Sequence, residues 1–165
     1  MTPARSKNAA FALALIVPAA LMGGALVSQY VFGLFPCEMC WWQRYPHIAA
    51  IVLAVLALAM KGKGRNGGGA GDLVVILAAI AIGLSGLIGG FHAGVEYGWW
   101  EGVTACATVA GGGNPLDAIM NAPVIRCDVA PWSLFGISLA GYNFLISIAG
   151  AILIFALLGK GRKGA

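Results

Sequence analysis

Four long runs of apolar residues, separated by short polar segments, make up most of the chain. A helix needs about 20 mostly apolar residues to cross roughly 30 Å of hydrocarbon. Three of the runs are long enough, and we expect spanning helices over about 9–33, 73–94 and 134–158. Pro18 lies inside the first run, where neighbouring helices can satisfy the carbonyl group that it frees.

The second apolar run is too short to span a membrane. Its purely apolar part, Ile48 to Met60, has 13 residues, which is roughly 20 Å as a helix. A spanning helix must therefore start near Trp41 and include Arg44 and His47. We expect this helix over about 41–60.

These segments together predict an all-α membrane protein, a four-helix transmembrane bundle that forms a single domain over 1–165. Two loops join the helices at one end, over about 34–40 and 97–132. The composition agrees, since 60% apolar residues, 10% charged residues and a mean hydropathy of +0.88 exclude an ordinary soluble domain. A cleaved signal peptide is the alternative for the first run, but the run is too long for one.

The charges predict an orientation. Eight of the ten lysine and arginine residues lie before the first run, between the second and third runs, or after the fourth. By the positive-inside rule, both termini and the glycine-rich segment "KGKGRNGGGAG" are cytoplasmic, and the other two loops face outward. The net charge of +4 is therefore a signal of topology, and it forms no nucleic-acid patch.

All four cysteines fall in the two outward loops, Cys37 and Cys40 in the first and Cys106 and Cys127 in the second. Thiols placed in this way indicate an oxidising compartment, where disulfides persist.

The second loop combines aromatic residues, glycines and a predicted short helix. Trp99 and Trp100 suit the membrane interface. After "GGG", the segment "NPLDAIM" predicts a short helix with an N-cap and one apolar stripe, either flat on the membrane surface or packed as a cap on the bundle. Twenty residues separate Cys106 from Cys127. A disulfide there would stabilise by about 3 kcal/mol as a staple, but a mobile exchanging disulfide fits this loop better.

The pair Cys37 and Cys40, spaced C-x-x-C, has three interpretations. Zinc would need four ligands, and the second pair lacks the close spacing of a zinc site. A structural disulfide across two residues would remove little unfolded-state entropy. Redox chemistry fits best, because Pro36 predicts a helix start where the helix dipole and Arg44 would stabilise a thiolate.

Arg44 and His92 lie at nearly the same depth, counted from the cytoplasmic ends of their helices. A buried arginine needs a partner or a ligand, although it can also snorkel to the interface. A thiol pair, a cation and a histidine at one level suit a lipid-soluble acceptor of two electrons, such as a quinone. We treat His47 as interfacial.

Four motifs in this order carry a family resemblance: "PCEMCWWQRYPH", "FHAGVEYGWWEGVTAC", "RCDVAPW" and "LFGISLAGYN". From about Ala9 to Leu158 the chain resembles the DsbB family of disulfide bond formation proteins. The resemblance implies a bacterial inner-membrane enzyme that reoxidises a periplasmic DsbA-like thiol oxidase and reduces ubiquinone or menaquinone.

The resemblance also implies residue roles. Cys106 would form the mixed disulfide with the DsbA-like partner, and Cys127 would pair with it. Cys37 would exchange with that second pair, and Cys40 would face the quinone. Arg44 and His92 would bind the quinone, whereas Gln43 stands where some members carry an acidic residue and receives no role.

Two alternatives remain at this stage. The vitamin K epoxide reductase family is similar in chemistry, but its C-x-x-C lies on a late helix. A four-span scaffold or transport component with structural disulfides is the other, and its best support is "GLSGLIGG", which close helix packing explains equally well.

Overall fold

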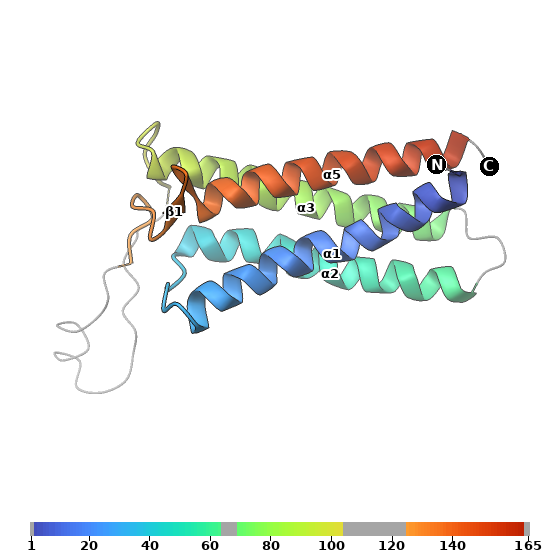
Figure 1. Ribbon diagram of the computed structural model, residues 1–165, viewed down its shortest axis with the longest axis horizontal. Coiled ribbons are helices and arrows are strands. Elements are labelled where there is room, and N and C mark those ends of the chain that lie inside the picture. The colour runs from blue at the N-terminus through green and yellow to red at the C-terminus, as the bar shows by residue number, and fades with distance from the viewer. Residues whose placement is uncertain (1, 64–68, 104–124, 164–165) are drawn as a thin grey trace.

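The computed structural model describes residues 2–63, 69–103 and 125–163. Four long helices run side by side along the molecule, and the two ends of the chain lie at the same end of the bundle (Figure 1). The elements in chain order are α1 (Pro3–Tyr30), α2 (Glu38–Lys63), α3 (Ala70–Glu96), β1 (Ser133–Leu134), β2 (Ile137–Ser138) and α5 (Leu139–Lys163).

All four helices are long and apolar enough to cross a membrane. The prediction of an all-α four-helix transmembrane bundle is thereby confirmed. The helix expected around "NPLDAIM" lies outside the described residues.

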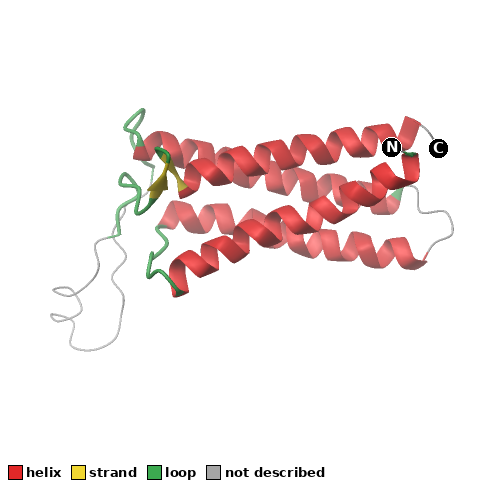
Figure 2. Cartoon of the chain, viewed as in Figure 1, coloured by secondary structure: helices red, strands yellow, loops and turns green. Residues whose placement is uncertain are grey.

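The helix boundaries differ from the expected ones at two important points. α2 begins at Glu38, so its first turn already contains Cys40, and it continues through Pro46 without a break. α5 begins at Leu139 and not near residue 134, because β1 and β2 form a tight antiparallel hairpin first (Figure 2). Phe135 and Gly136 turn this hairpin with φ angles of 51° and 77°, which a helix start does not permit.

The half of the bundle nearest the termini holds the main apolar core. Alanines of all four helices meet there, with larger side chains such as Phe11, Val75, Ile82 and Ile154 between them. Small residues let helix backbones approach closely, which is the usual way that helices associate in membranes.

The glycines of α3 continue this close approach toward the other end. A Cβ atom added at Gly86 would lie 2.9 Å from Cβ of Ser147, and one at Gly89 would lie 2.9 Å from the backbone oxygen of Ala140. Contacts this short are not tolerated, so α3 and α5 touch here only because both positions are glycine. Close packing therefore accounts for the motif "GLSGLIGG".

Candidate redox site

The first cysteine pair lies at the N-terminus of α2, as the sequence predicted. Cys37 immediately precedes the helix, and its sulfur accepts a hydrogen bond from the backbone N–H of Cys40 at 3.3 Å. This is the position of a helix N-cap, which satisfies one of the exposed N–H groups of the first turn. Pro36 lies before the cap and outside the helix, so its expected place in the first turn is wrong.

The two sulfur atoms are in contact. The Cys37 thiol donates to the Cys40 sulfur at 3.0 Å, and both residues are free thiols. That hydrogen bond, followed by burial, raises the pKa of Cys37 well above its usual range. Since Cys37 keeps its proton, the expected stabilisation of a thiolate does not extend to it.

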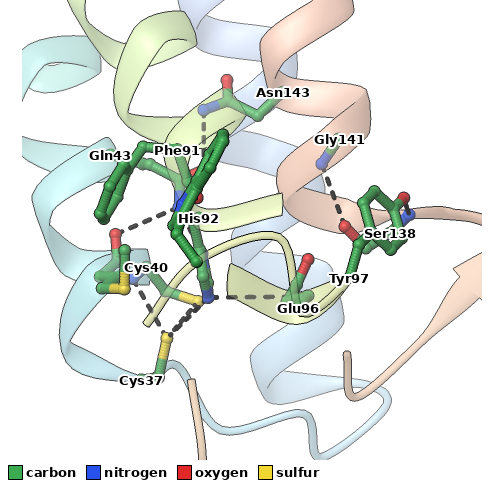
Figure 3. A network of polar contacts seen from close by, with 12 residues as sticks. Cys37, Cys40, Gln43, Phe91, His92, Glu96, Tyr97, Ser138, Gly141 and Asn143 are labelled. Atoms are coloured by element: carbon green, nitrogen blue, oxygen red, sulfur yellow. Dashed lines mark hydrogen bonds and ion pairs between the residues drawn. The ribbon is translucent and has the colours of Figure 1, made fainter. Parts of the chain in front are cut away.

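His92 of α3 reaches the cysteines from the opposite side (Figure 3). Its Nε2 lies 3.6 Å from Cys37 Sγ and 3.8 Å from a carboxylate oxygen of Glu96, and the residue is 2% exposed. The Gln43 amide donates to Met39 O at 3.1 Å and contacts His92 Nδ1 at 2.9 Å. The NH₂ group of an amide only donates hydrogen bonds, so His92 Nδ1 is the acceptor in this contact. In the neutral ring Nε2 then carries the hydrogen, which faces the thiol.

Asn143 of α5 ties this network to the centre of the bundle. Its amide nitrogen donates to Gln43 Oε1 at 2.9 Å and to the backbone oxygen of Ser85 at 3.2 Å. Its oxygen faces His47 Nε2 at 2.9 Å and accepts from the Ser147 hydroxyl at 2.8 Å. One amide thus joins α2, α3 and α5 below the cysteines.

Arg44 is only 8% exposed and points toward α1. Its guanidinium donates to Gln29 Oε1 at 2.6 Å and to the backbone oxygen of Ala25 at 3.2 Å, and it lies over the ring of Trp41. Within the described ranges, no carboxylate forms an ion pair with it. The predicted partners therefore exist, but they are neutral and leave the positive charge uncompensated.

A cavity of about 230 Å³ lies beside these groups, lined by residues of α1, α2, α3 and α5. Cys40, Arg44, His47 and His92 all line it, so Cys40 and Arg44 share a face of α2 in spite of Pro46. Most of the lining is apolar and comes from α1 and α5. Arg44 and His92, which were expected at one level, both border this space.

Two buried acceptors on the wall of this cavity lack partners. Among the described residues, three buried side-chain atoms have no hydrogen-bond partner, and two of them are His47 Nδ1 and Glu96 Oε2. Both residues line the cavity. Such atoms are rare because an unsatisfied buried polar group costs about 1–3 kcal/mol, and they fit a ligand with polar groups on an apolar ring.

A second cavity, of about 510 Å³, opens between α3 and α5. Phe91, Trp100 and Phe144 border it, and none of the described residues that line it is a cysteine or a histidine. Although it is larger, its described lining offers no group suited to redox chemistry.

The second-loop cysteines are only partly described. Cys127 is 1% exposed and packs in one buried cluster with Cys37, Met39 and Val95. Cys106 lies outside the described residues. Folding therefore brings Cys127 beside the first pair, although 86 or more residues separate it from them in the sequence.

The hairpin that follows Cys127 in the chain is tied to α3, and the two residues on either side of Cys127 form an exposed ion pair. The Tyr97 hydroxyl donates to Gly136 O and accepts from the Ser138 N–H, both at 3.1 Å, which fixes the hairpin to the end of α3. Arg126 and Asp128 form a two-point ion pair with contacts of 2.9 and 2.6 Å. The hydrogen bond from Arg126 lowers the pKa of Asp128 and raises its own.

A metal ion is the other ligand to consider at the cysteines. Cys37, Cys40 and His92 offer three possible ligand atoms within 4.8 Å of one another. Structural zinc sites close with four ligands, and this trio supplies three.

Sequence reasoning missed three members of the network: Gln43, Glu96 and Asn143. Each is polar and lies on an apolar spanning helix. Since polar residues inside such helices are expensive and usually face partners, this signal was present in the sequence. It did not show which residues would meet.

Comparison with known proteins agrees with the motif resemblance. The family model for disulfide bond formation protein DsbB matches residues 7–157. Proteins named disulfide bond formation protein B are similar over most of their length: that of Verminephrobacter eiseniae is 29% identical over 98% of this chain and 91% of its own. The one from Acidovorax sp. is 30% identical over 93% and 89%. No solved structure matches the chain significantly.

Proposed function

Because the chain belongs to the DsbB family of disulfide bond formation proteins, we propose that it reoxidises a DsbA-like thiol oxidase and passes the electrons to a membrane quinone. Membership makes it a disulfide-forming oxidoreductase, and its four spanning helices make it a multi-pass membrane protein. The finer proposal concerns the donor, the acceptor and the residues that connect them.

The proposed reaction balances as a transfer of two electrons and two protons. Two partner thiols become a disulfide as they reduce the Cys106–Cys127 disulfide through a mixed disulfide at Cys106. The resulting thiols then reduce a Cys37–Cys40 disulfide by a second exchange. A quinone, ubiquinone or menaquinone, supplies the oxidising power and leaves as the hydroquinone with the two electrons and two protons.

The cavity beside Cys40 is the observation that carries this proposal. It brings a thiol, an uncompensated guanidinium and two histidines to the wall of an apolar space inside a membrane bundle. A soluble oxidant has no reason to bind there, whereas a lipid-soluble one does. Unpartnered acceptors on the same wall support a ligand that carries polar atoms.

Each side chain has a distinct proposed role. Arg44 binds the acceptor and stabilises the negative charge that develops on its oxygen during reduction. His92 holds a hydrogen on Nε2, 3.6 Å from Cys37 Sγ, and directs it at the sulfur, where it can stabilise negative charge that develops during exchange. Gln43 acts as a positioning residue, because its amide fixes the orientation of the His92 ring.

The placement of Cys127 supports exchange between the two pairs. Its burial in one cluster with Cys37 puts the second-loop thiol within the neighbourhood of the first pair. A disulfide exchange needs such an approach of one sulfur to another.

We further propose that the protein lies in the bacterial inner membrane, with both termini in the cytoplasm and the cysteines in the periplasm. The distribution of lysine and arginine supports this orientation. So does the arrangement in Figure 1, where the cysteine-bearing start of α2 lies at the end of the bundle opposite the termini.

A coupled assay tests the proposal. Purified protein, a reduced DsbA-like oxidase and a short-chain quinone should consume one quinone for each pair of thiols. Cys106→Ala should block electron entry from the partner, and Arg44→Ala should raise the quinone KM while the protein still binds the partner. Folded protein that reduces no quinone would contradict the enzyme. Loss of stability without any redox effect, on removal of either cysteine pair, would instead favour a membrane scaffold.

A further inference from the structure

His47 is a buried titratable residue to which the proposed reaction gives no role. It is 4% exposed, it lies on the same side of α2 as Cys40 and Arg44, and it lines the same cavity. Its Nδ1 has no hydrogen-bond partner among the described residues. A histidine that merely packed at the interface would not need to leave a nitrogen unpaired next to a cavity.

The neighbouring amide fixes which nitrogen of His47 carries the hydrogen. The Asn143 amide nitrogen faces Ser85 O and Gln43 Oε1, which are acceptors, so the Asn143 oxygen must be the atom that faces His47. That oxygen requires a donor from His47 Nε2 at 2.9 Å. In the neutral ring Nδ1 is then an acceptor with a vacant lone pair.

An acceptor inside the cavity selects between the two forms of a quinone. The oxidised form presents carbonyl oxygens, which only accept hydrogen bonds, whereas the hydroquinone presents hydroxyl groups that donate. Arg44, one turn away on α2, has only donors and so suits an oxygen that accepts. The two residues therefore differ in the form of the ligand that each prefers.

We propose that His47 Nδ1 accepts a hydrogen bond from a hydroxyl group of the bound hydroquinone, and that His47 thereby favours the reduced form of the ligand over the oxidised form. This inference rests on the proposed function, in that the cavity takes a quinone. It concerns binding alone, since the hydroquinone keeps both of its protons.

Equilibrium binding tests the inference without turnover. In the full-length Cys40→Ser background, which prevents electron transfer with the ligand, tryptophan fluorescence titrations under anaerobic conditions give dissociation constants for a short-chain ubiquinone and for its hydroquinone. His47→Phe keeps the ring volume and removes both nitrogens. Hydroquinone affinity should fall about 3- to 10-fold, as for the loss of one buried hydrogen bond, while quinone affinity changes little. A tenfold fall in the ratio of hydroquinone affinity to quinone affinity lowers the reduction potential of the bound couple by about 30 mV.

Ser147→Ala is the matched control. It removes the other hydrogen bond to the Asn143 oxygen and leaves His47 in place, so the ratio of the two affinities should stay at the parent value. His47→Leu is a second variant, because its side chain is smaller than that of phenylalanine and has no hydrogen-bonding atom. It should shift the ratio in the same direction, including if His47→Phe fails to fold.

The possible outcomes test the role of His47 and the binding of a quinone separately. An unchanged ratio in both His47 variants would overturn the role of His47, because a water molecule would then satisfy Nδ1. An equal loss of affinity for both forms would also overturn it, because the ring would then only shape the cavity. If the parent protein binds neither form, the quinone part of the proposed function fails as well.

Discussion

Near the chain termini the four helices meet through alanines and a few larger apolar side chains, which form one buried core. Near the cysteines the same helices enclose a cavity and bury Gln43, Arg44, His92 and Asn143. A membrane bundle gains little from burying apolar groups, because lipid tails are equally apolar. The half near the termini therefore shows that close packing of small and apolar side chains is sufficient for the helices to associate.

The second half is expensive by the same reasoning. Polar groups within spanning helices cost free energy unless they are paired, and a cavity forfeits packing contacts. Two acceptors on the cavity wall are unpaired, whereas the one unpaired atom of the terminal half among the described residues, Asp72 Oδ1, belongs to a carboxylate that is paired with Lys7. The difference between the halves indicates that the cysteine end is arranged for a ligand and for chemistry, and the terminal end for stability.

The largest effect should come from the thiol at the rim of the cavity. Cys40→Ala should reduce quinone reduction to the rate without enzyme, because Cys40 is the only thiol among the described residues that line the cavity. Mixed-disulfide formation with the DsbA-like partner should persist, since it uses Cys106. Quinone reduction measured by absorbance, together with trapping of the mixed disulfide, checks both halves of this prediction, and residual quinone turnover would remove Cys40 from its role.

Filling the cavity should have the next largest effect. A Cβ atom added at Gly24, which lines the cavity, meets nothing within 4 Å. Gly24→Leu should therefore fold normally and raise the quinone KM by about tenfold, which corresponds to ~1.4 kcal/mol.

Gly23→Leu is the control for that variant. The neighbouring position also has nothing within 4 Å of an added Cβ atom, but it is outside the cavity lining. Its KM should match the wild type. Equal effects of the two substitutions would mean that the ligand does not occupy this cavity.

Two substitutions in α5 compare the halves directly. Ile154→Ala, in the packed half, should lower the free energy of unfolding by about 2 kcal/mol, at the low end for such truncations because lipid replaces water as the solvent. Asn143→Ala should cost about 1–2 kcal/mol through lost interhelical hydrogen bonds and should also slow turnover several-fold. Denaturation in detergent measures the change in stability, and the coupled assay measures the change in turnover. A folded Ile154→Ala protein with slower turnover would contradict the distinction between the two halves.

The smallest expected effect concerns the pH dependence of Cys37. Its raised pKa means that the folded, reduced protein keeps a proton that an ordinary thiol loses near the reference value of 9.0. Alkylation of Cys37, measured by mass spectrometry, should stay slow through that pH and accelerate only above it. Rapid alkylation of Cys37 at neutral pH would contradict its raised pKa.

The same raised pKa fixes the direction of a stability change. Its contribution to folding is fully present below the ordinary thiol pKa and is lost as pH rises through the folded value. Reduced protein should thus lose stability in alkali, and Cys37→Ala should lose less.

The sequence was sufficient for the parts of the fold that depend on segment length. Apolar runs predicted four spanning helices, and the deficit of the second run predicted that Arg44 would enter the membrane boundary. The start of α5 was harder to predict, because Phe135 adopts a positive φ angle that its residue type does not indicate.

Contacts between helices were the part that the sequence could not supply. That Cys40 and Arg44 share a face of α2 follows from their spacing of four residues on one helix. The meeting of Gln43 with His92 and Asn143 depends on how three helices rotate and on Gly89, where an added Cβ would lie 2.9 Å from the Asn143 amide nitrogen. No spacing within one segment encodes such an arrangement.

Photoaffinity labelling with an azidoquinone tests the central claim most directly, because, among the described residues, α1 and α2 line the smaller cavity and not the larger one. We predict crosslinks in the segments that line the smaller cavity, around Ala25 in α1 and from Cys40 to His47 in α2, and competition by unmodified quinone. Crosslinks confined to the larger cavity, around Phe91 and Phe144, would contradict the account, since no cysteine or histidine is among the described residues that line it.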